Sequence, residues 1–232
     1  MKQTIGLECR LVIPSAFWRV ANNTLMEDKE RMATLLNVNS EEAKRISLNY
    51  QKSKLVGGSC LVEVMRATDV GKFRLIENGE LKPDDYICED SLEMVKELSD
   101  KKYNIEIFTK GGSQCVYSAL KHTPLNQLVE SGEIQVTSVS TDRFNSHDRR
   151  TSDCYEEWDK RMGSQNKDLK AYITDREDEG LACLNANIPA AFVDRNQKYH
   201  GSDFQLDNGL WLMDDLSKTK NWLRYLQEGK NE

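Results

Sequence analysis

The sequence predicts an α/β fold, in which a parallel sheet is covered by helices on both faces and carries an inserted α-helical cap. Three observations lead to this prediction. A short apolar segment near the N-terminus is typical of a buried strand, the segment after it has helical periodicity, and strands then alternate with helices to the end of the chain. With 232 residues, the chain is long enough for one large domain or for a core that carries a smaller insertion.

The first predicted strand covers Ile5–Ile13. This segment is largely apolar, although Glu8 and Arg10 interrupt it, and it closes at Pro14. We expect such a segment to form a buried strand that leads into a loop.

Residues 15–84 are predicted to form the helical cap, so the core comprises residues 1–14 and 85–232. Turn signals near residues 78–79 and 82–83 mark the end of the insertion. Three helical segments are predicted within it. Ser40-Glu41-Glu42 opens the second segment with a serine N-cap, and Gly57-Gly58 separates it from the third, Ser59–Arg66. The first is marked by apolar residues at helical spacing: Leu25, Met32, Leu35 and Leu36.

After residue 84, predicted helices and strands alternate regularly. In chain order they are the helix Asp90–Lys101, the strand Ile105–Thr109, a helix from Ser113, the strand Ile134–Val139, the helix Asp153–Arg161, the strand Lys170–Thr174, the helix Glu177–Ala186, the strand Ala190–Val193, a short strand Leu210–Met213 and a closing helix Leu216–Leu226. Alternation at this spacing is typical of a Rossmann-like parallel sheet with helices on both faces.

The composition argues against two classes of partner. The formal net charge is −6 at pH 7, whereas general nucleic-acid binding and binding to an anionic membrane both favour a basic surface. No stretch approaches the roughly 18 apolar residues of a membrane-spanning helix, and no basic region followed by a long apolar run begins the chain. We therefore expect a cytoplasmic protein that binds neither nucleic acid in general nor membranes.

Six cysteines are spread along the chain without a close pair: Cys9, Cys60, Cys88, Cys115, Cys154 and Cys183. Their spacing suits neither a zinc knuckle nor a dense disulfide scaffold. We predict that they are reduced and mostly buried thiols.

Ligands of an open parallel sheet bind at the carboxyl ends of its strands, so the residues that directly follow each strand are the candidate ligand-binding residues. Thr109 ends one predicted strand and precedes Lys110, Gly111 and Gly112. The threonine hydroxyl, the backbone amides around the two glycines and the N-terminus of the next helix could together bind an anion.

A second strand end carries carboxylates. Asp175 follows the strand Lys170–Thr174, and Glu179 lies four residues later, with Asp178 as an alternative. Carboxylate oxygens on a loop between a strand and a helix suit magnesium, which prefers hard oxygen ligands.

Both segments resemble haloacid-dehalogenase-like (HAD) proteins. The run from Leu92 to Gly112 resembles the segment of these proteins that ends in a phosphate-binding Ser or Thr, and Thr109 takes that place. The run from Ala171 to Val193 is similar to the acidic motif of the family, in which an Asp and a second carboxylate hold magnesium. The resemblance therefore implies a phosphate site at Thr109, Lys110 and Gly111, and a magnesium site at Asp175 and Glu179.

The nucleophile motif departs from the family. HAD phosphatases end their first strand in Asp-x-Asp, where the first Asp attacks phosphorus and the second transfers a proton, but the corresponding residues here are Glu8-Cys9-Arg10. Glu8 keeps a carboxylate on a longer side chain, which displaces the attacking oxygen by roughly an ångström. Arg10 stays protonated and cannot act as a general acid or base. We infer from this that Arg10 pairs with Asp175 and takes the place of the metal.

The family also has a lysine about 25 residues before its acidic Asp, and that spacing leads to Arg150 in this chain. Arginine can bind phosphate through its guanidinium fork, although its geometry differs from that of lysine. Lys160 and Lys167 are alternatives. If the register of the resemblance is different, Asp84-Asp85 and Asp214-Asp215 are other carboxylate pairs, but neither has the expected strand and loop beside it.

The insertion directly after the first strand resembles the helical cap of a HAD subgroup that includes pyrimidine 5′-nucleotidase-like phosphatases. The resemblance then covers nearly the whole chain. It implies that Phe17, Trp18 and Arg19 lie at the cap hinge above the pocket, where an aromatic ring could stack on a base, although packing explains Phe17 and Trp18 more simply.

Three functions follow, in order of preference. The first is a pseudoenzyme or impaired phosphatase homologue that binds an anionic, for example phosphorylated, small molecule or a protein partner. The second is an active magnesium-dependent phosphohydrolase that acts on a small phosphomonoester such as a nucleotide, with Glu8 as an atypical nucleophile. The third is a halide-releasing enzyme, because relatives with that activity need no metal; the missing Asp nucleophile counts against it.

Overall fold

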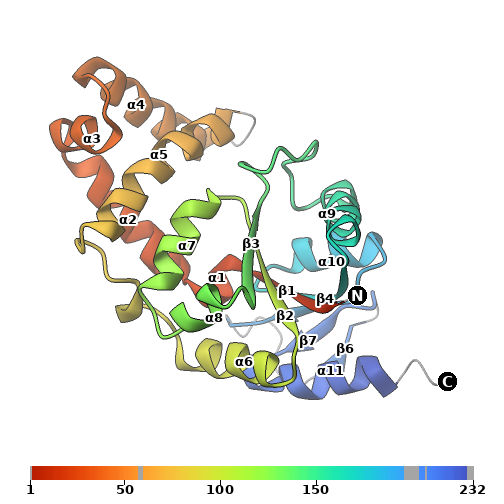
Figure 1. The fold of residues 1–232 in the computed structure, drawn as a ribbon. Coiled ribbons are helices and arrows are strands. Elements are labelled where there is room, and N and C mark those ends of the chain that lie inside the picture. The colour runs from red at the N-terminus through yellow and green to blue at the C-terminus, as the bar shows by residue number, and fades with distance from the viewer. Residues whose placement is uncertain (1, 57–59, 196–203, 207, 229–232) are drawn as a thin grey trace.

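The computed structural model describes residues 2–56, 60–195, 204–206 and 208–228 (Figure 1). Its strands are β1 (Lys2–Glu8), β2 (Asn104–Thr109), β3 (Ile134–Ser138), β4 (Lys167–Thr174), β5 (Ala190–Val193), β6 (Phe204–Gln205) and β7 (Trp211–Met213). Its α-helices are α1 (Cys9–Val12), α2 (Ser15–Glu27), α3 (Lys29–Leu36), α4 (Ser40–Val56), α5 (Cys60–Glu77), α6 (Glu89–Asp100), α7 (Ser113–Lys121), α8 (Asn126–Glu130), α9 (Ser152–Ser164), α10 (Glu177–Asn185) and α11 (Thr219–Glu228). Short 3₁₀ helices cover Pro83–Asp85 and Leu216–Lys218.

The strands form one seven-stranded sheet in the order β3-β2-β1-β4-β5-β7-β6. Every pairing is parallel except that of β6 with β7 at the edge. The predicted α/β fold with a parallel, Rossmann-like sheet is therefore confirmed. The antiparallel edge strand was not predicted, because two residues are too few to show a period.

Alternate residues of each strand face opposite sides of the sheet, and this divides the core into two apolar layers. On one side, Ile5 and Leu7 of β1 belong to a buried cluster with α6, α7 and α11. On the other side, Phe108 of β2 and Tyr172 of β4 pack against Trp158 of α9. Figure 1 shows α9 and α10 across the sheet from α6 and α11.

Gly6 of β1 leaves space for the aromatic side chains on the α9 side of the sheet. A Cβ atom built on Gly6 would lie 2.3 Å from Cη2 of Trp158, and that indole stacks on Phe108 with ring centroids 4.2 Å apart. Gly6→Ala is therefore expected to lower the free energy of unfolding by about 1–3 kcal/mol, because the packed indole has no space to move.

Gly163 provides the matched control for Gly6. It lies in α9, and a Cβ atom there would meet nothing within 4 Å. Gly163→Ala is expected to raise the free energy of unfolding slightly, by up to about 1 kcal/mol, because alanine favours a helix. Urea titration of both variants measures the difference; a Gly6→Ala variant as stable as wild type would contradict this account of the layer.

The first strand is shorter than predicted. β1 ends at Glu8, and the residues after it form α1, so the prediction of a strand over Ile5–Ile13 is wrong in its second half. The Glu8 carboxylate accepts a hydrogen bond from the backbone amide of Arg10, and the amide of Ile13 donates to the carbonyl of Cys9. This cap turns the chain out of the sheet directly after Glu8.

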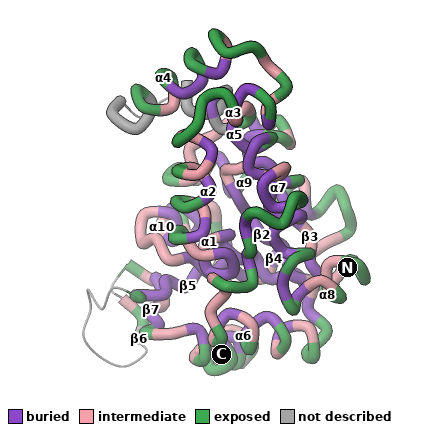
Figure 2. The backbone as a smooth tube through the Cα atoms, turned by 90° about the vertical axis from the view of Figure 1, so that its left-hand side faces the viewer, coloured by how far each residue is buried: buried purple, intermediate pink, exposed green. Residues whose placement is uncertain are grey.

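Helices α2–α5 lie beyond the carboxyl edge of the sheet, at the upper left of Figure 1. Leu25 of α2, Met32 of α3 and Leu75 of α5 are buried in the same apolar cluster as one face of the sheet, and Figure 2 shows buried positions that continue from the strands into α2. The cap therefore shares its apolar core with the sheet. Its division from the core at residues 15–84 stays a prediction.

The third cap helix is longer than predicted. The prediction placed it at Ser59–Arg66, of which Ser59 lies outside the described residues, as does Gly57-Gly58, whereas α5 continues to Glu77. Polar residues in its second half are buried: Thr68 is 0%, Asp69 7% and Lys72 7% exposed. They interrupt the apolar period from which the helix was predicted.

The five cysteines whose side chains are described are free thiols, as predicted. Four of them are buried and Cys88 is half-buried. Burial raises the pKa of Cys115 to about 12, so this thiol is protonated and unreactive at neutral pH. In the described part of the chain, no helix combines the length and the apolar character needed to cross a bilayer.

Candidate functional site

Three strand ends meet at one point of the sheet. Glu8 ends β1 and Thr109 ends β2, while Asp175 directly follows β4. β1 lies between β2 and β4, and the chain changes direction there, since it proceeds outward through β2 and β3 before β4 returns to the other side of β1. Ligands bind at such a switch point because the loops separate and leave a crevice.

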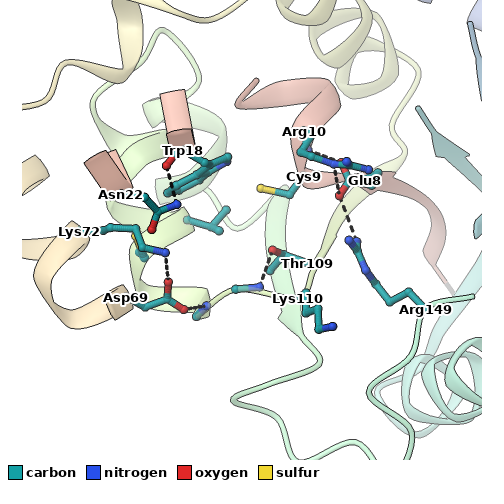
Figure 3. A pocket seen from close by; sticks show the side chains of 14 residues that line it. Glu8, Cys9, Arg10, Trp18, Asn22, Asp69, Lys72, Thr109, Lys110 and Arg149 are labelled. Atoms are coloured by element: carbon teal, nitrogen blue, oxygen red, sulfur yellow. Dashed lines mark hydrogen bonds and ion pairs between the residues drawn. The ribbon is translucent and has the colours of Figure 1, made fainter. Parts of the chain in front are cut away.

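A cavity of about 240 Å³ lies at this point between the core and the cap (Figure 3). The core contributes the ends of β1 and β2, the first turn of α7 and one residue of the loop before α9, Arg149. The cap contributes Trp18 and Asn22 from α2, and Asp69 and Lys72 from α5. Charged groups of both signs therefore line the cavity.

Arg10 joins two of the strand ends. Its Nη2 lies 2.7 Å from Oδ1 of Asp175, and its Nε lies 3.2 Å from Oε1 of Glu8. Its backbone amide donates to the other oxygen of Glu8. The expected pairing of Arg10 with Asp175 is thus present, and a fixed positive charge lies between the carboxylates of Glu8 and Asp175.

Arg149 joins Glu8 to the acidic segment. Its Nη1 lies 3.1 Å from Oε1 of Glu8, and its Nη2 lies 3.3 Å from Oε1 of Glu179. The Arg149 side chain is 10% exposed, and both carboxylates are more deeply buried. Glu8 therefore has guanidinium groups on two sides (Figure 3).

The structure does not bring Arg150, the predicted phosphate-binding cation, into this site. Its side chain is 62% exposed and pairs with Asp148 at 2.8 Å. The spacing indicates the correct loop, but the residue of this loop that contacts Glu8 is Arg149, one position earlier, because consecutive loop residues point in different directions. The two alternative lysines also lie outside the site. Lys160 is exposed on α9. Lys167 begins β4, at the opposite end of this strand from Asp175, and pairs there with Glu106.

The predicted phosphate-binding segment lines the cavity. The Thr109 hydroxyl oxygen accepts a hydrogen bond from the amide of Gly111 at 3.1 Å, which folds the loop tightly at the end of β2. Lys110 is half-buried beside it, and burial, with Arg149 as the next cause, lowers its pKa. Nearby carboxylates compensate the positive charge of Lys110 only in part, so an anion in the cavity would stabilise the charged form.

The carboxylates of the acidic segment are strongly perturbed. Burial raises the pKa of Asp175, and the nearby Glu8 raises it further although Arg10 opposes them. Burial raises the pKa of Glu179 to about 7 in spite of Arg149. Asp178, the alternative metal ligand, pairs instead with Arg176 at 2.6 Å.

These residues do not fit a magnesium ion. Magnesium needs several oxygen ligands around one point, but Arg10 lies between Glu8 and Asp175, and Arg149 contacts Glu179. Across the described ranges, no group of three His, Cys, Asp or Glu side chains is placed to hold a metal. The obstacle is the charge of the two guanidinium groups, which would repel a divalent cation.

The three residues predicted at the cap hinge have different surroundings. Phe17 is fully buried and packs edge-on against Trp18, with ring centroids 4.9 Å apart. Trp18 lines the cavity and donates its Nε1 hydrogen to the carbonyl of Ile13 at 3.1 Å. Arg19 is exposed.

Apart from Trp18, the residues that the cap contributes to the cavity were not predicted from the sequence. Asn22, Asp69 and Lys72 line it, and Lys72 pairs with Asp69 at 2.6 Å. The sequence offers one weak signal, since residues three apart on a helix are neighbours, but such pairs are common on exposed helix faces. Only the packing of α5 against α7 shows that this pair faces the core.

Comparison with known proteins places the fold. No family model and no curated protein matches the chain. Among solved structures, a HAD phosphatase from Thermococcus onnurineus matches with a TM-score of 0.55 and 14% identity over 96% of this chain and 98% of that one. A haloacid dehalogenase-like family hydrolase from Xanthomonas campestris matches with a TM-score of 0.54 and 12% identity over 100% of this chain and 95% of that one.

A defluorinating L-2-haloacid dehalogenase also matches, with a TM-score of 0.51 and 15% identity over 96% of this chain and 95% of that one. The chain is similar to these hydrolases over nearly its whole length, and it therefore has the HAD-like fold. Because phosphatases and dehalogenases share this fold at such low identity, the likeness leaves the activity to be argued from the residues of the site.

Proposed function

We propose that this HAD-like chain binds a small phosphorylated or otherwise anionic molecule without magnesium and without hydrolysing it. The observation that carries the proposal is the guanidinium of Arg10 between Glu8 and Asp175. It supplies a fixed positive charge next to the carboxylates, where a phosphatase of this fold would need a metal and a second Asp.

The state of Glu8 supports the same proposal. Its side chain is 2% exposed, and its oxygens accept contacts from the amide and guanidinium of Arg10 and from Arg149. A carboxylate held by this many donors is a weak nucleophile, because attack on phosphorus would require it to leave those hydrogen bonds. The proton shuttle is missing as well, since arginine does not release its proton at physiological pH.

The cations of the cavity support anion binding. Lys110 and Arg149 line it together with Thr109 and the first turn of α7, and the lowered pKa of Lys110 indicates that its charge is poorly compensated. The position of the cap directly after β1 supports the finer likeness to pyrimidine 5′-nucleotidase-like proteins, for which Trp18 would offer an aromatic surface to the ligand.

Phosphate binding and phosphate release together test the proposal. We expect calorimetry to detect binding of inorganic phosphate with the same affinity in magnesium and in EDTA. We expect no magnesium-dependent phosphate release from a panel of nucleotides and sugar phosphates, for wild type or for Asp175→Asn. Release by wild type that Asp175→Asn abolishes would establish the alternative, an active magnesium-dependent phosphohydrolase with Glu8 as its nucleophile.

A double substitution provides the positive control. Glu8→Asp with Arg10→Asp restores the family's pair of aspartates and removes the guanidinium from Asp175. We expect this variant to bind magnesium in calorimetry whereas wild type does not, because three carboxylates then surround the position that Arg10 now fills. Tight magnesium binding by wild type would contradict the proposal. Absence of phosphate binding by wild type would also contradict it and would favour a protein partner.

A further inference from the structure

A second cavity adjoins the first. It has a volume of about 300 Å³ and is lined by α5, by the first turn of α7 and by Thr141. Asp69, Gly112 and Cys115 line both cavities. The contact between α5 and the start of α7 therefore forms the wall between them.

The polar part of this wall is one buried carboxylate. Oδ2 of Asp69 accepts a hydrogen bond from the amide of Gly112, and Oδ1 lies 2.6 Å from Nζ of Lys72 (Figure 3). The side chains of Asp69 and Lys72 are 9% and 8% exposed. A Cβ atom on Gly112 would lie 3.0 Å from Oδ2 of Asp69, so glycine allows this close approach.

The wall belongs to the cap on one side and to the core on the other. Asp69 lies on α5 and is separated from Gly112 by 43 residues in the sequence. Two more contacts join α5 to the core on either side of it: Arg66 donates to the carbonyl of Ser140 at 2.9 Å, and Ser118 donates to Glu77 at 2.5 Å. Among the α5 residues of this seam, Asp69 lines both cavities, whereas Arg66 lines the second cavity alone.

The location of Asp69 places it in competition with a ligand. Gly112 precedes the first turn of α7, where backbone amides point outward and attract negative charge. The same cavity holds Thr109 and Lys110. The chain's own carboxylate therefore uses a donor that an anion bound in the first cavity would otherwise reach.

We propose that Asp69 is a gate that determines which ligands the site accepts: it closes the first cavity against the second and occupies the Gly112 amide and Lys72. While the gate is shut, the site accepts only compact anions. When Asp69 moves away, an anion can use both donors, and the apolar part of a longer ligand can extend along Val70 and Phe73, which line the second cavity. This inference rests on the anion binding proposed above.

The gate is tested first by chemical rescue, which needs no knowledge of the natural ligand. Asp69→Ala leaves a carboxylate-sized space beside Gly112 and Lys72, and formate can fill it. We expect formate to raise the melting temperature of Asp69→Ala in a saturable way, with a smaller and non-saturating effect on wild type. Asp90→Ala, which removes a half-exposed pair with Arg195, is the matched control, because neither residue lines either cavity, and it should behave as wild type does.

The gate is tested next by calorimetry with two anions of different length, inorganic phosphate and hexyl phosphate. Asp69→Ala should strengthen binding of hexyl phosphate about tenfold more than binding of phosphate: the freed Gly112 amide and Lys72 ammonium are open to both anions, but only the longer one can use the joined cavities. Asp69→Asn, which keeps the shape of the wall, should leave the ratio of the two affinities near that of wild type.

The possible failures are distinguishable. If wild type and all variants fail to bind phosphate, the proposed function is wrong, and formate rescue still decides whether the slot accepts a carboxylate. If phosphate binds and the affinity ratio is the same in Asp69→Ala as in wild type, the gate is wrong. Formate effects that are equal in Asp69→Ala and Asp90→Ala also overturn it. Should Asp69→Ala not fold in buffer alone, folding restored by formate supports the gate, and failure to restore it counts against it.

Discussion

Replacing Arg149 by methionine is expected to lower the free energy of unfolding by about 3–5 kcal/mol. The substitution keeps an apolar side chain of similar length and removes the guanidinium that lies 3.1 Å from Glu8 and 3.3 Å from Glu179. Those carboxylates are 2% and 3% exposed. Among the described residues, the cations that would remain paired with these carboxylates are Arg10 for Glu8 and Arg176, at 3.5 Å, for Glu179, so buried negative charge is left poorly compensated.

The neighbouring arginine is the control for this prediction. Arg150→Met removes an exposed guanidinium that pairs with Asp148 on the surface, where solvent screens the charges and an ion pair stabilises little. Urea unfolding should show a large fall in the midpoint for Arg149→Met and almost none for Arg150→Met. Equal effects of the two substitutions would mean that the bridge between Glu8 and Glu179 does not stabilise the fold.

Glu179 is expected to make the protein less stable as the pH rises from about 4.5 to about 7. Burial raises its pKa from the ordinary value of 4.5 to about 7 in the folded state. In this window the unfolded chain loses the Glu179 proton while the folded chain keeps it, so the folded state binds more protons and its stability falls with rising pH. The pKa difference corresponds to about 3 kcal/mol when the pH exceeds both values.

Glu179→Gln isolates this contribution, because glutamine keeps the shape of the side chain and does not titrate. The free energy of unfolding of wild type, minus that of Glu179→Gln, should decrease by about 3 kcal/mol between pH 4.5 and pH 8. Asp178→Asn is the control: its hydrogen bonds with Arg176 lower the pKa of Asp178 below its ordinary value, so its stabilising effect is lost only in more acidic solution. A difference between wild type and Glu179→Gln that does not change with pH would show that folding does not raise the pKa of Glu179.

Glu179 and Arg149 together explain why the acidic segment does not behave as a simple metal site. Three carboxylates meet at the strand ends, and two guanidinium groups lie among them. A proton on Glu179 brings this buried group nearer to neutrality, which is the state that a low-dielectric interior favours. The charge that a divalent ion would supply is thus already provided by arginine and by a proton.

The sequence alone was sufficient for the fold class and for the core segments of the site, those at the ends of β1, β2 and β4. Alternating strands and helices of the correct lengths specify a parallel sheet, and residues that follow its strands must gather at one edge. This places Glu8 and Thr109 in one cavity and Asp175 beside it, in contact with Arg10. The resemblance to HAD proteins showed that Arg10 stands where an aspartate is expected, and the magnesium site implied by that resemblance, with electrostatics, suggested Asp175 as its partner.

Only the tertiary structure decided which arginine of the loop faces the carboxylates, where β1 ends, and what Asp69 contacts. Arg149 and Arg150 are adjacent and chemically identical, so the direction of each depends on how the loop packs. Asp69 and Gly112 lie 43 residues apart, and their contact depends on how α5 crosses α7. Periodicity and spacing describe local order along the chain, whereas these choices are made by packing between segments that are distant in sequence.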